Sequence, residues 1–133
     1  KEALVIKRRI DKSNQDRTDM VEEIDDYFFQ KFKDIASSND AILNTETPAW
    51  AIDRLSILEL KIYHMRIESE RESADESHKL NCLEKLNVLL LQRENLSTAI
   101  DQLLTNISVG KVKAVTYKQM KICCLQRRKS LTH

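Results

Sequence analysis

The chain has 133 residues, which is enough for one domain built around one core. It contains a single glycine and a single proline, against average usages of about 7% and 5%, and 32% of its residues are charged, so long solvated helices are expected. No apolar run approaches the roughly 20 residues that cross a bilayer, and no Gly-rich phosphate loop occurs. Membrane-spanning proteins and P-loop or Rossmann nucleotide-binding proteins are therefore excluded.

The formal net charge is +1, but the charges are unevenly distributed. Residues 111–133 hold seven of the 22 Lys and Arg residues and none of the 21 Asp and Glu residues. We expect this basic tail to dock on the acidic remainder of the chain; contact with phosphate or with an acidic neighbour is the alternative. Nucleic acid is not expected as a partner, because the tail has one aromatic residue, Tyr117, and no nucleic-acid-binding motif.

Residues 1–133 are expected to form a single helical domain without a cofactor. The three cysteines are odd in number and the start does not resemble a signal peptide, which favours a cytoplasmic protein with reduced thiols. Lys1 already lies inside a helical pattern, so we expect further residues upstream of it.

The first predicted helix covers residues 3–36. Its apolar residues recur at steps of three and four, which keeps them on one face of a helix about 50 Å long. The stripe is interrupted midway, where Ser13, Asn14 and Arg17 fall on the inward face. The apolar positions are Ile6, Ile10, Val21, Ile24, Phe28, Phe32 and Ile35.

Residues 37–47 read as a connecting loop. Thr47-Pro48 is a typical helix start, with the threonine as N-cap and the proline in the first helical position. The second helix that opens here is apolar on more than one face, because Ile57, Leu60 and Ile67 lie away from its main stripe. Such a helix is central or lies at an oligomer interface. The main stripe is Ile52, Leu55, Leu58, Ile62 and Met65.

A third helix follows a tight turn. Ser73 and Glu76 have capping-box spacing, so Ser73 is the predicted N-cap, and Gly110 is the predicted C-terminal stop. Val112, Val115 and Met120 then suggest a short fourth helix in the basic tail. The inward positions of the third helix recur at alternating steps of three and four, the heptad spacing typical of left-handed bundles. These positions are Leu83, Leu86, Leu90, Arg93, Ser97, Ile100, Leu104 and Ile107.

These elements predict an all-α bundle of three long helices plus a short basic C-terminal helix, with the second and third as an antiparallel hairpin. A homodimer is expected. Helices near 50 Å in 133 residues make a slender body, and the second helix has more apolar surface than one neighbour covers.

Polar residues interrupt the apolar seams of all three helices. Asn14 and Arg17 do so on the first and Arg93 on the third, while the second adds Asp53, Arg54 and Glu59. A guanidinium group taken from water is costly unless it is paired, so Arg17 and Arg93 should meet carboxylates, with Asp53 and Glu59 as the expected partners in a buried polar layer. The functional alternative is a small carboxylate or phosphate bound by Arg17, Arg54 and Arg93.

Other chemistry has little support in the sequence. Asp75 and His78 lie one helical turn apart and could face His64 and Glu68 across a hairpin, but helical di-metal sites use two Glu-x-x-His pairs and two further glutamates. No metal is therefore expected, and these four residues are weak candidates only. No catalytic residue is identified, because neither a serine elbow nor an activated cysteine context occurs.

The second helix carries a family resemblance. Asn44-Thr-Glu-Thr-Pro48, Ile52-Asp-Arg-Leu-Ser-Ile-Leu58 and Leu60-Lys-Ile-Tyr-His-Met65, with Ile10-Asp11, Asn14-Gln15-x-Arg17 and Gln92-Arg93, resemble the uncharacterised bacterial proteins of domain-of-unknown-function family 4254 over residues 7–121. The resemblance implies a helical cytoplasmic protein and no established activity. A looser similarity, through Arg8 or Arg9 with Ile10-Asp11, is to all-helical chorismate mutases, but the apolar run after Asp11 that they require is missing.

Two functions follow from the sequence. The first is a non-enzymatic interaction or assembly module. The second is an anion-binding enzyme of the helical-mutase type. Whether the inner arginines are already neutralised by carboxylates separates the two.

Overall fold

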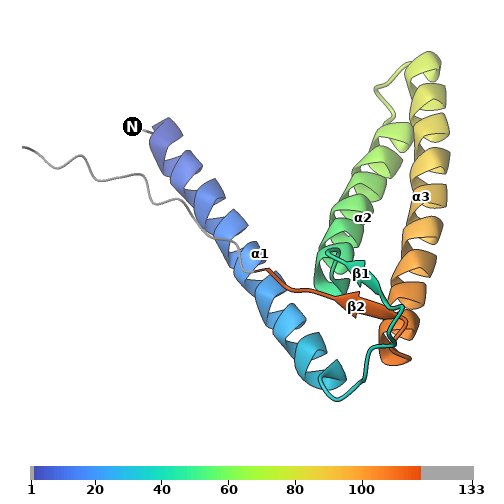
Figure 1. Ribbon diagram of the computed structural model, residues 1–133. Coiled ribbons are helices and arrows are strands. Elements are labelled where there is room, and N and C mark those ends of the chain that lie inside the picture. The colour runs from blue at the N-terminus through green and yellow to red at the C-terminus, as the bar shows by residue number, and fades with distance from the viewer. Residues whose placement is uncertain (1, 118–133) are drawn as a thin grey trace, which may run out of the picture.

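The computed structural model describes residues 2–117 of the chain. In this range three helices and two short strands follow one another: α1 (Glu2–Phe32), β1 (Ile42–Asn44), α2 (Pro48–Glu70), α3 (Glu76–Ser108) and β2 (Val112–Ala114) (Figure 1). The prediction of three long helices is confirmed. The described chain is mostly helical rather than all helical, because the two strands pair.

α1 ends at Phe32, four residues earlier than predicted, although Ile35 continues the apolar spacing. The Ile35 amide donates to the Phe32 carbonyl at 3.0 Å and closes a turn, and the Ser38 amide then donates to the Gly110 carbonyl at 3.0 Å. Gly110 lies 72 positions further along the chain, so the contact that draws this segment out of the helix is invisible to local periodicity.

α2 begins as predicted. Thr47 is the N-cap, its hydroxyl accepts a hydrogen bond from the Trp50 amide at 3.3 Å, and Pro48 occupies the first turn. The prediction of Ser73 as the cap of α3 is wrong. Asp75 caps that helix instead, and its Oδ1 accepts from the His78 amide at 2.6 Å. Asp and Ser are about equally good N-caps, so the capping-box spacing did not distinguish them.

The C-terminus of α3 is the glycine stop that the sequence predicted. Gly110 has φ 73°, its amide donates to the Ile107 carbonyl at 3.0 Å, and the Lys111 amide donates to the Asn106 carbonyl at 2.9 Å. This pair of bonds is the Schellman motif, which satisfies carbonyls that the helix end leaves free. The chain therefore turns sharply and leads directly into β2.

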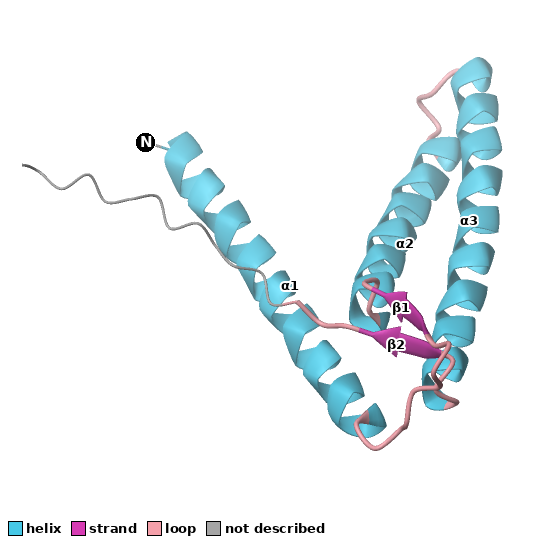
Figure 2. Cartoon of the chain, in the orientation of Figure 1, coloured by secondary structure: helices cyan, strands magenta, loops and turns pink. Residues whose placement is uncertain are grey.

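β1 and β2 correct two predictions. Residues 42–44 were expected in a loop and residues 112–114 in a short helix, but they form a parallel ribbon in which Ile42 lies opposite Val112 and Asn44 opposite Ala114 (Figure 2). Three apolar residues at helical spacing are a weak local signal, and the strand is stabilised by a partner about 70 residues away. The rest of the predicted tail helix, with its docking on the acidic body, lies outside the described residues.

α2 and α3 lie side by side, joined by residues 71–75 at one end (Figure 1). Leu58, Ile62 and Leu86 form the buried centre of their contact, with Met65, Leu89, Leu90 and Leu96 packed around it.

α1 crosses α2 only near the base of the pair and then diverges (Figure 1). Val21 and Asp25 are buried, whereas residues 2–14 of α1 are all exposed. No helix among the described residues combines the length and the apolar character needed to span a bilayer.

Gly110→Ala tests how far the fold depends on this turn. A Cβ atom at position 110 would collide with the Ala36 carbonyl oxygen, and the positive φ disfavours alanine, so we expect a loss of about 2 kcal/mol or more in the free energy of unfolding. Thermal denaturation followed by circular dichroism measures the loss. The neighbouring variant Lys111→Ala, at an exposed side chain, is the control, and equal melting temperatures for the two variants would contradict the prediction.

Candidate functional site

Asp25 and Thr47 form the most deeply buried polar contact of the described chain, with residue exposures of 7% and 2%. The Thr47 hydroxyl donates to Asp25 Oδ2 at 2.9 Å while it accepts from the Trp50 amide. One side chain therefore caps α2 and holds α2 to α1. Sequence reasoning missed this contact, although Asp25 lies four residues after Val21 and three before Phe28, on the inward stripe of α1.

The Asp25 carboxylate is in an unfavourable electrostatic environment. Burial raises its pKa above 3.8; the Thr47 hydroxyl and the Ala49 amide lower it, and the nearby charges of Asp26 and Glu22 raise it further. Within residues 2–117, its Oδ1 has no hydrogen-bond partner of standard geometry. A buried acceptor without a partner costs about 1–3 kcal/mol, so this oxygen is the most conspicuous unsatisfied group in the site.

A cavity of about 170 Å³ lies beside Asp25, between α1, β2 and the start of α2. Its lining is mainly apolar, and two lysines also contribute to it. The lining residues are Asp25, Phe28, Phe29, Phe32, Lys33, Ile35, Ser37, Thr47, Pro48, Ile107, Val112, Lys113, Ala114 and Thr116. A cavity of about 150 Å³ with an apolar lining accommodates one benzene molecule, so this volume suits a single ring.

The polar residues predicted from the sequence form separate ion pairs. Arg17 Nε lies 3.2 Å from Asp53 Oδ1, between α1 and α2, and Arg93 Nε lies 3.7 Å from Glu59 Oε1, between α3 and α2. These are the two carboxylates expected from the sequence. The third pair shares no residue with them: Arg54 Nη2 is 3.0 Å from Glu46 Oε1. The side chain of the remaining candidate, Asn14, is exposed.

Residues 2–117 do not form the buried polar layer that the sequence predicted. The side chains of Arg17 and Arg93 are 50% and 44% exposed, because α1 leaves α2 beyond their crossing and no other described helix covers them. The side chain of Asp53 is 9% exposed, and it is the one well-shielded member of these two ion pairs. Ion pairs this exposed stabilise a fold by about 0–1 kcal/mol, so their structural value in the single chain is small.

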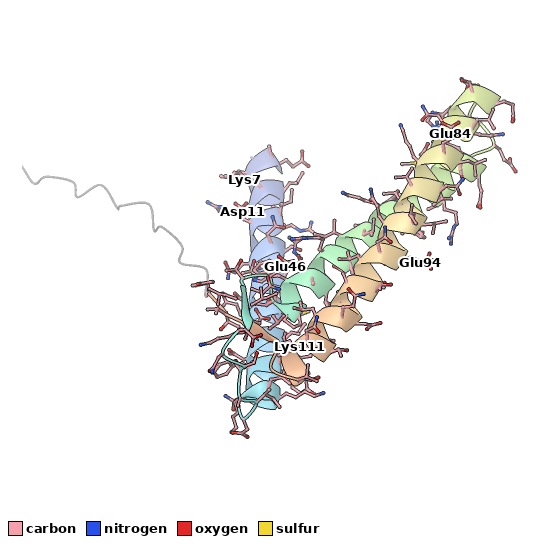
Figure 3. The ribbon with its side chains drawn as sticks, turned by 45° about the vertical axis from the view of Figure 1, so that its right-hand side comes forward. Lys7, Asp11, Glu46, Glu84, Glu94 and Lys111 are labelled. Carbon is pink, nitrogen blue, oxygen red and sulfur yellow. The ribbon has the colours of Figure 1, made fainter. Side chains whose placement is uncertain are left out.

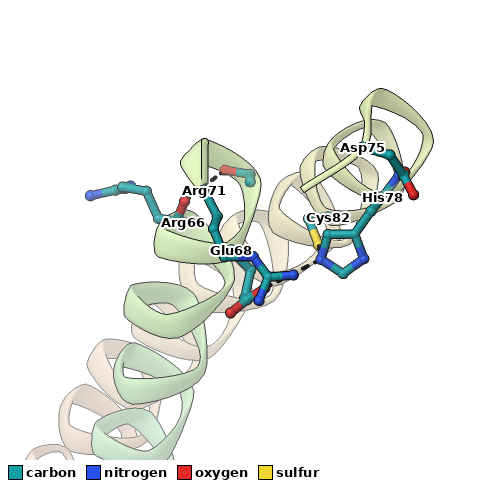
Figure 4. Close-up of polar contacts among 7 residues, drawn as sticks. Arg66, Glu68, Arg71, Asp75, His78 and Cys82 are labelled. Atoms are coloured by element: carbon teal, nitrogen blue, oxygen red, sulfur yellow. Dashed lines mark hydrogen bonds and ion pairs between the residues drawn. The ribbon is translucent and has the colours of Figure 1, made fainter. Parts of the chain in front are cut away.

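Three of the four weak metal candidates, Glu68, Asp75 and His78, have other contacts at the far end of α2 and α3 (Figure 4). Asp75 is the N-cap of α3, and Glu68 Oε2 lies 3.3 Å from His78 Nε2 and 3.5 Å from Arg71 Nη1. His78 Nε2 also lies 3.4 Å from the Sγ atom of the buried Cys82. His64 instead packs edge-on against Tyr63, with ring centroids 5.4 Å apart. No group of three or more His, Cys, Asp or Glu side chains in the described range could hold a metal ion.

Comparison with known proteins identifies one family. The family described as "Protein of unknown function (DUF4254)" matches residues 1–116. Neither the curated proteins nor the solved structures include a match to the chain. The function must therefore be argued from the geometry.

Replacing Asp25 tests the burial of its charge. Because the folded pKa is raised, wild-type stability increases as pH falls from neutral through the folded pKa toward the unfolded value near 3.9, whereas Asp25→Asn does not titrate there. The difference in melting temperature, variant minus wild type, should be largest at neutral pH and should shrink on acidification. Asp16→Asn is the control, because Asp16 is exposed on the same helix and is not among the charges that raise the pKa of Asp25. A difference independent of pH would refute the assignment.

Proposed function

The chain belongs to the DUF4254 family of proteins of unknown function, and we propose that it is a non-enzymatic assembly module whose partner is a second copy of itself. The observation that carries this proposal is the apolar surface of the free half of α1. In the same proposal α2 and α3 form an antiparallel hairpin and the protein acts in the bacterial cytoplasm, which the odd number of cysteines supports.

The free half of α1 exposes large apolar side chains. Leu4, Val5, Ile6 and Ile10 are each 54–56% exposed. Of these, Ile6 and Ile10 share a helical face with Arg17 and Val21, which contact or pack toward α2 further along. The inward stripe of α1 therefore continues beyond the crossing, where no described residue of the same chain covers it.

α2 presents a matching stripe. Asp53, which pairs with Arg17, marks the side of α2 that α1 crosses, and Leu60, Tyr63 and Ile67 follow on that side at helical spacing. These three side chains are 46–59% exposed. The two stripes border the same opening between α1 and α2, so an α1 helix from a second copy could contact both.

Burial energies favour such pairing. Fully burying one Val, Leu, Ile or Phe side chain stabilises by about 1.5–3 kcal/mol, and a two-fold interface would form the same contact between the two stripes twice. A helix without tertiary packing is only marginally stable in water, which gives α1 a further reason to pair. The same contact would cover Arg17 and Asp53, so the polar layer expected from the sequence would arise between chains.

The charges are complementary as well. Residues 2–12 carry four Lys or Arg residues and two acids, whereas residues 66–76 carry two arginines and five acids. Lys7 and Asp11 lie toward the free end of α1 (Figure 3) and already pair with each other at 3.0 Å, which leaves Arg8, Arg9 and Lys12 for a partner. Opposite charges at the two ends would favour one register of the pair.

The alternative, an anion-binding enzyme, has less support. Arg17, Arg54 and Arg93 each lie within 4 Å of a carboxylate oxygen in the same chain. A guanidinium group that is already neutralised attracts an added anion weakly. The three ion pairs are also separate, so they do not converge on one ligand.

Substituting the inward stripe should separate the copies. Size-exclusion chromatography with light scattering should give twice the 15.5 kDa chain mass for the wild type and the single-chain mass for Ile6→Asp with Ile10→Asp, because two buried carboxylates would oppose association. Leu4→Asp with Val5→Asp is the matched control, since these residues are equally exposed but lie outside the inward stripe. A monomeric wild type at high micromolar concentration, or equal dissociation of both double variants, would rule the proposal out.

A further inference from the structure

We propose that the cavity beside Asp25 binds a small monocarboxylate that carries one apolar ring, with the ring inside the cavity and the carboxylate at its rim, next to Lys33 and Lys113. The site uses none of the three arginines discussed above and does not depend on self-assembly. It lies beside the C-terminal half of α1, whereas the stripe proposed for the dimer begins at Ile6 and Ile10.

The cavity has an apolar inner wall and a polar rim. The apolar residues of the lining that are buried or half-buried form the inner wall, among them Phe28, Phe32, Pro48 and Ile107. The polar residues of the lining that are exposed form the rim, and these are Lys33, Ser37, Lys113 and Thr116. Ligand sites commonly combine an apolar lining with a few polar groups that fix orientation. A ligand for this cavity therefore has an apolar body and a polar head group.

The size of the cavity selects a single ring as the body. Its volume of about 170 Å³ slightly exceeds the roughly 150 Å³ that holds one benzene molecule. Phe28 and Phe32 stack nearly parallel in the lining, with ring centroids 6.2 Å apart. An aromatic ligand would add further ring contacts to this pair.

The two lysines select a negative head group. Within residues 2–117, neither Lys33 nor Lys113 forms an ion pair with a carboxylate of the chain. Both side chains are exposed, so they can meet a ligand carboxylate at the rim without losing all their water. Two positive charges there attract an anionic head group and repel a cationic one.

Asp25 sets the orientation of the ligand. Its Oδ2 accepts from the Thr47 hydroxyl and its Oδ1 is buried, so the ligand does not hydrogen-bond to this side chain. Its charge nevertheless repels a carboxylate held deep in the cavity, because the protein interior screens charges less than water does. Repulsion at the inner wall and attraction at the rim both direct the ligand carboxylate outward.

Chemical-shift titration of the nitrogen-15-labelled full chain with phenylacetate, phenylacetamide and phenethylamine tests the proposal, because the three probes share one ring and differ in charge. We expect phenylacetate to bind most tightly and phenethylamine most weakly, with the largest shifts at the amides of the cavity lining. Exposed ion pairs are weak, so Lys33→Gln and Lys113→Gln should each weaken phenylacetate binding about two- to fivefold. Both variants should bind the neutral phenylacetamide as the wild type does.

Two further variants control for charge and for location. Lys111→Gln removes an exposed lysine that lies outside the lining and should leave phenylacetate binding unchanged. Ala114→Leu fills part of the cavity and should weaken phenylacetate and phenylacetamide alike, by about tenfold or more. Circular dichroism shows whether each variant is folded. If Ala114→Leu does not fold, the two lysine variants at exposed positions decide the matter.

Four results would overturn the proposal. The first is no phenylacetate binding to the folded wild type, and the second is binding of phenylacetamide or phenethylamine as tight as that of phenylacetate. The third is an equal effect of Lys111→Gln and the two rim variants, and the fourth is unchanged binding in folded Ala114→Leu. None of these results bears on the oligomeric state, so this proposal and the assembly proposal can fail separately.

Discussion

The structure depends on the two hydrogen bonds of the Thr47 hydroxyl. It accepts from the Trp50 amide and so begins α2, and it donates to Asp25 and so fixes where α1 crosses that helix. Thr47 is 2% exposed, so water does not compete for either hydrogen bond of its hydroxyl. Asp25 and Thr47 also line the cavity, and the Arg17–Asp53 pair is a second contact between the same two helices.

α1 diverges from α2, and this explains why its apolar stripe and its arginine are only partly covered within one chain. Its apolar stripe continues past α2, and its arginine pairs with Asp53 while remaining half exposed. A protein that kept this surface in water would lose the stabilisation that burial provides. Self-association would cover the apolar stripe and the Arg17–Asp53 pair with a single contact. We therefore prefer it to a function that uses the arginines alone.

The buried Asp25 raises a separate question. Charged carboxylates are rarely buried without a cation, and here the hydroxyl and amide donors do not offset the cost of burial. The bond to Thr47 therefore fixes the crossing of α1 and α2 at the cost of a destabilised carboxylate.

Much of the architecture could be read from the sequence because helix starts, helix stops and apolar stripes arise from residues within about one turn of each other. Thr47-Pro48 and Gly110 are such signals, and both were predicted correctly. The ion-pair partners Asp53 and Glu59 could also be predicted, because an arginine in an apolar seam needs a carboxylate and the second helix offers few on the facing side. Where two good caps compete, as Ser73 and Asp75 do, the local energies are too similar to decide.

The sequence by itself thus determined three helices, two of their ends and the charge partners of two arginines. Only the tertiary structure decided that α1 stops at Phe32, that residues 42–44 and 112–114 pair as strands, and that Asp25 meets Thr47 beside a cavity. Each of these contacts joins residues about 20 to 70 positions apart. Their free energy depends on how the helices cross, and no pattern within a few residues carries that information.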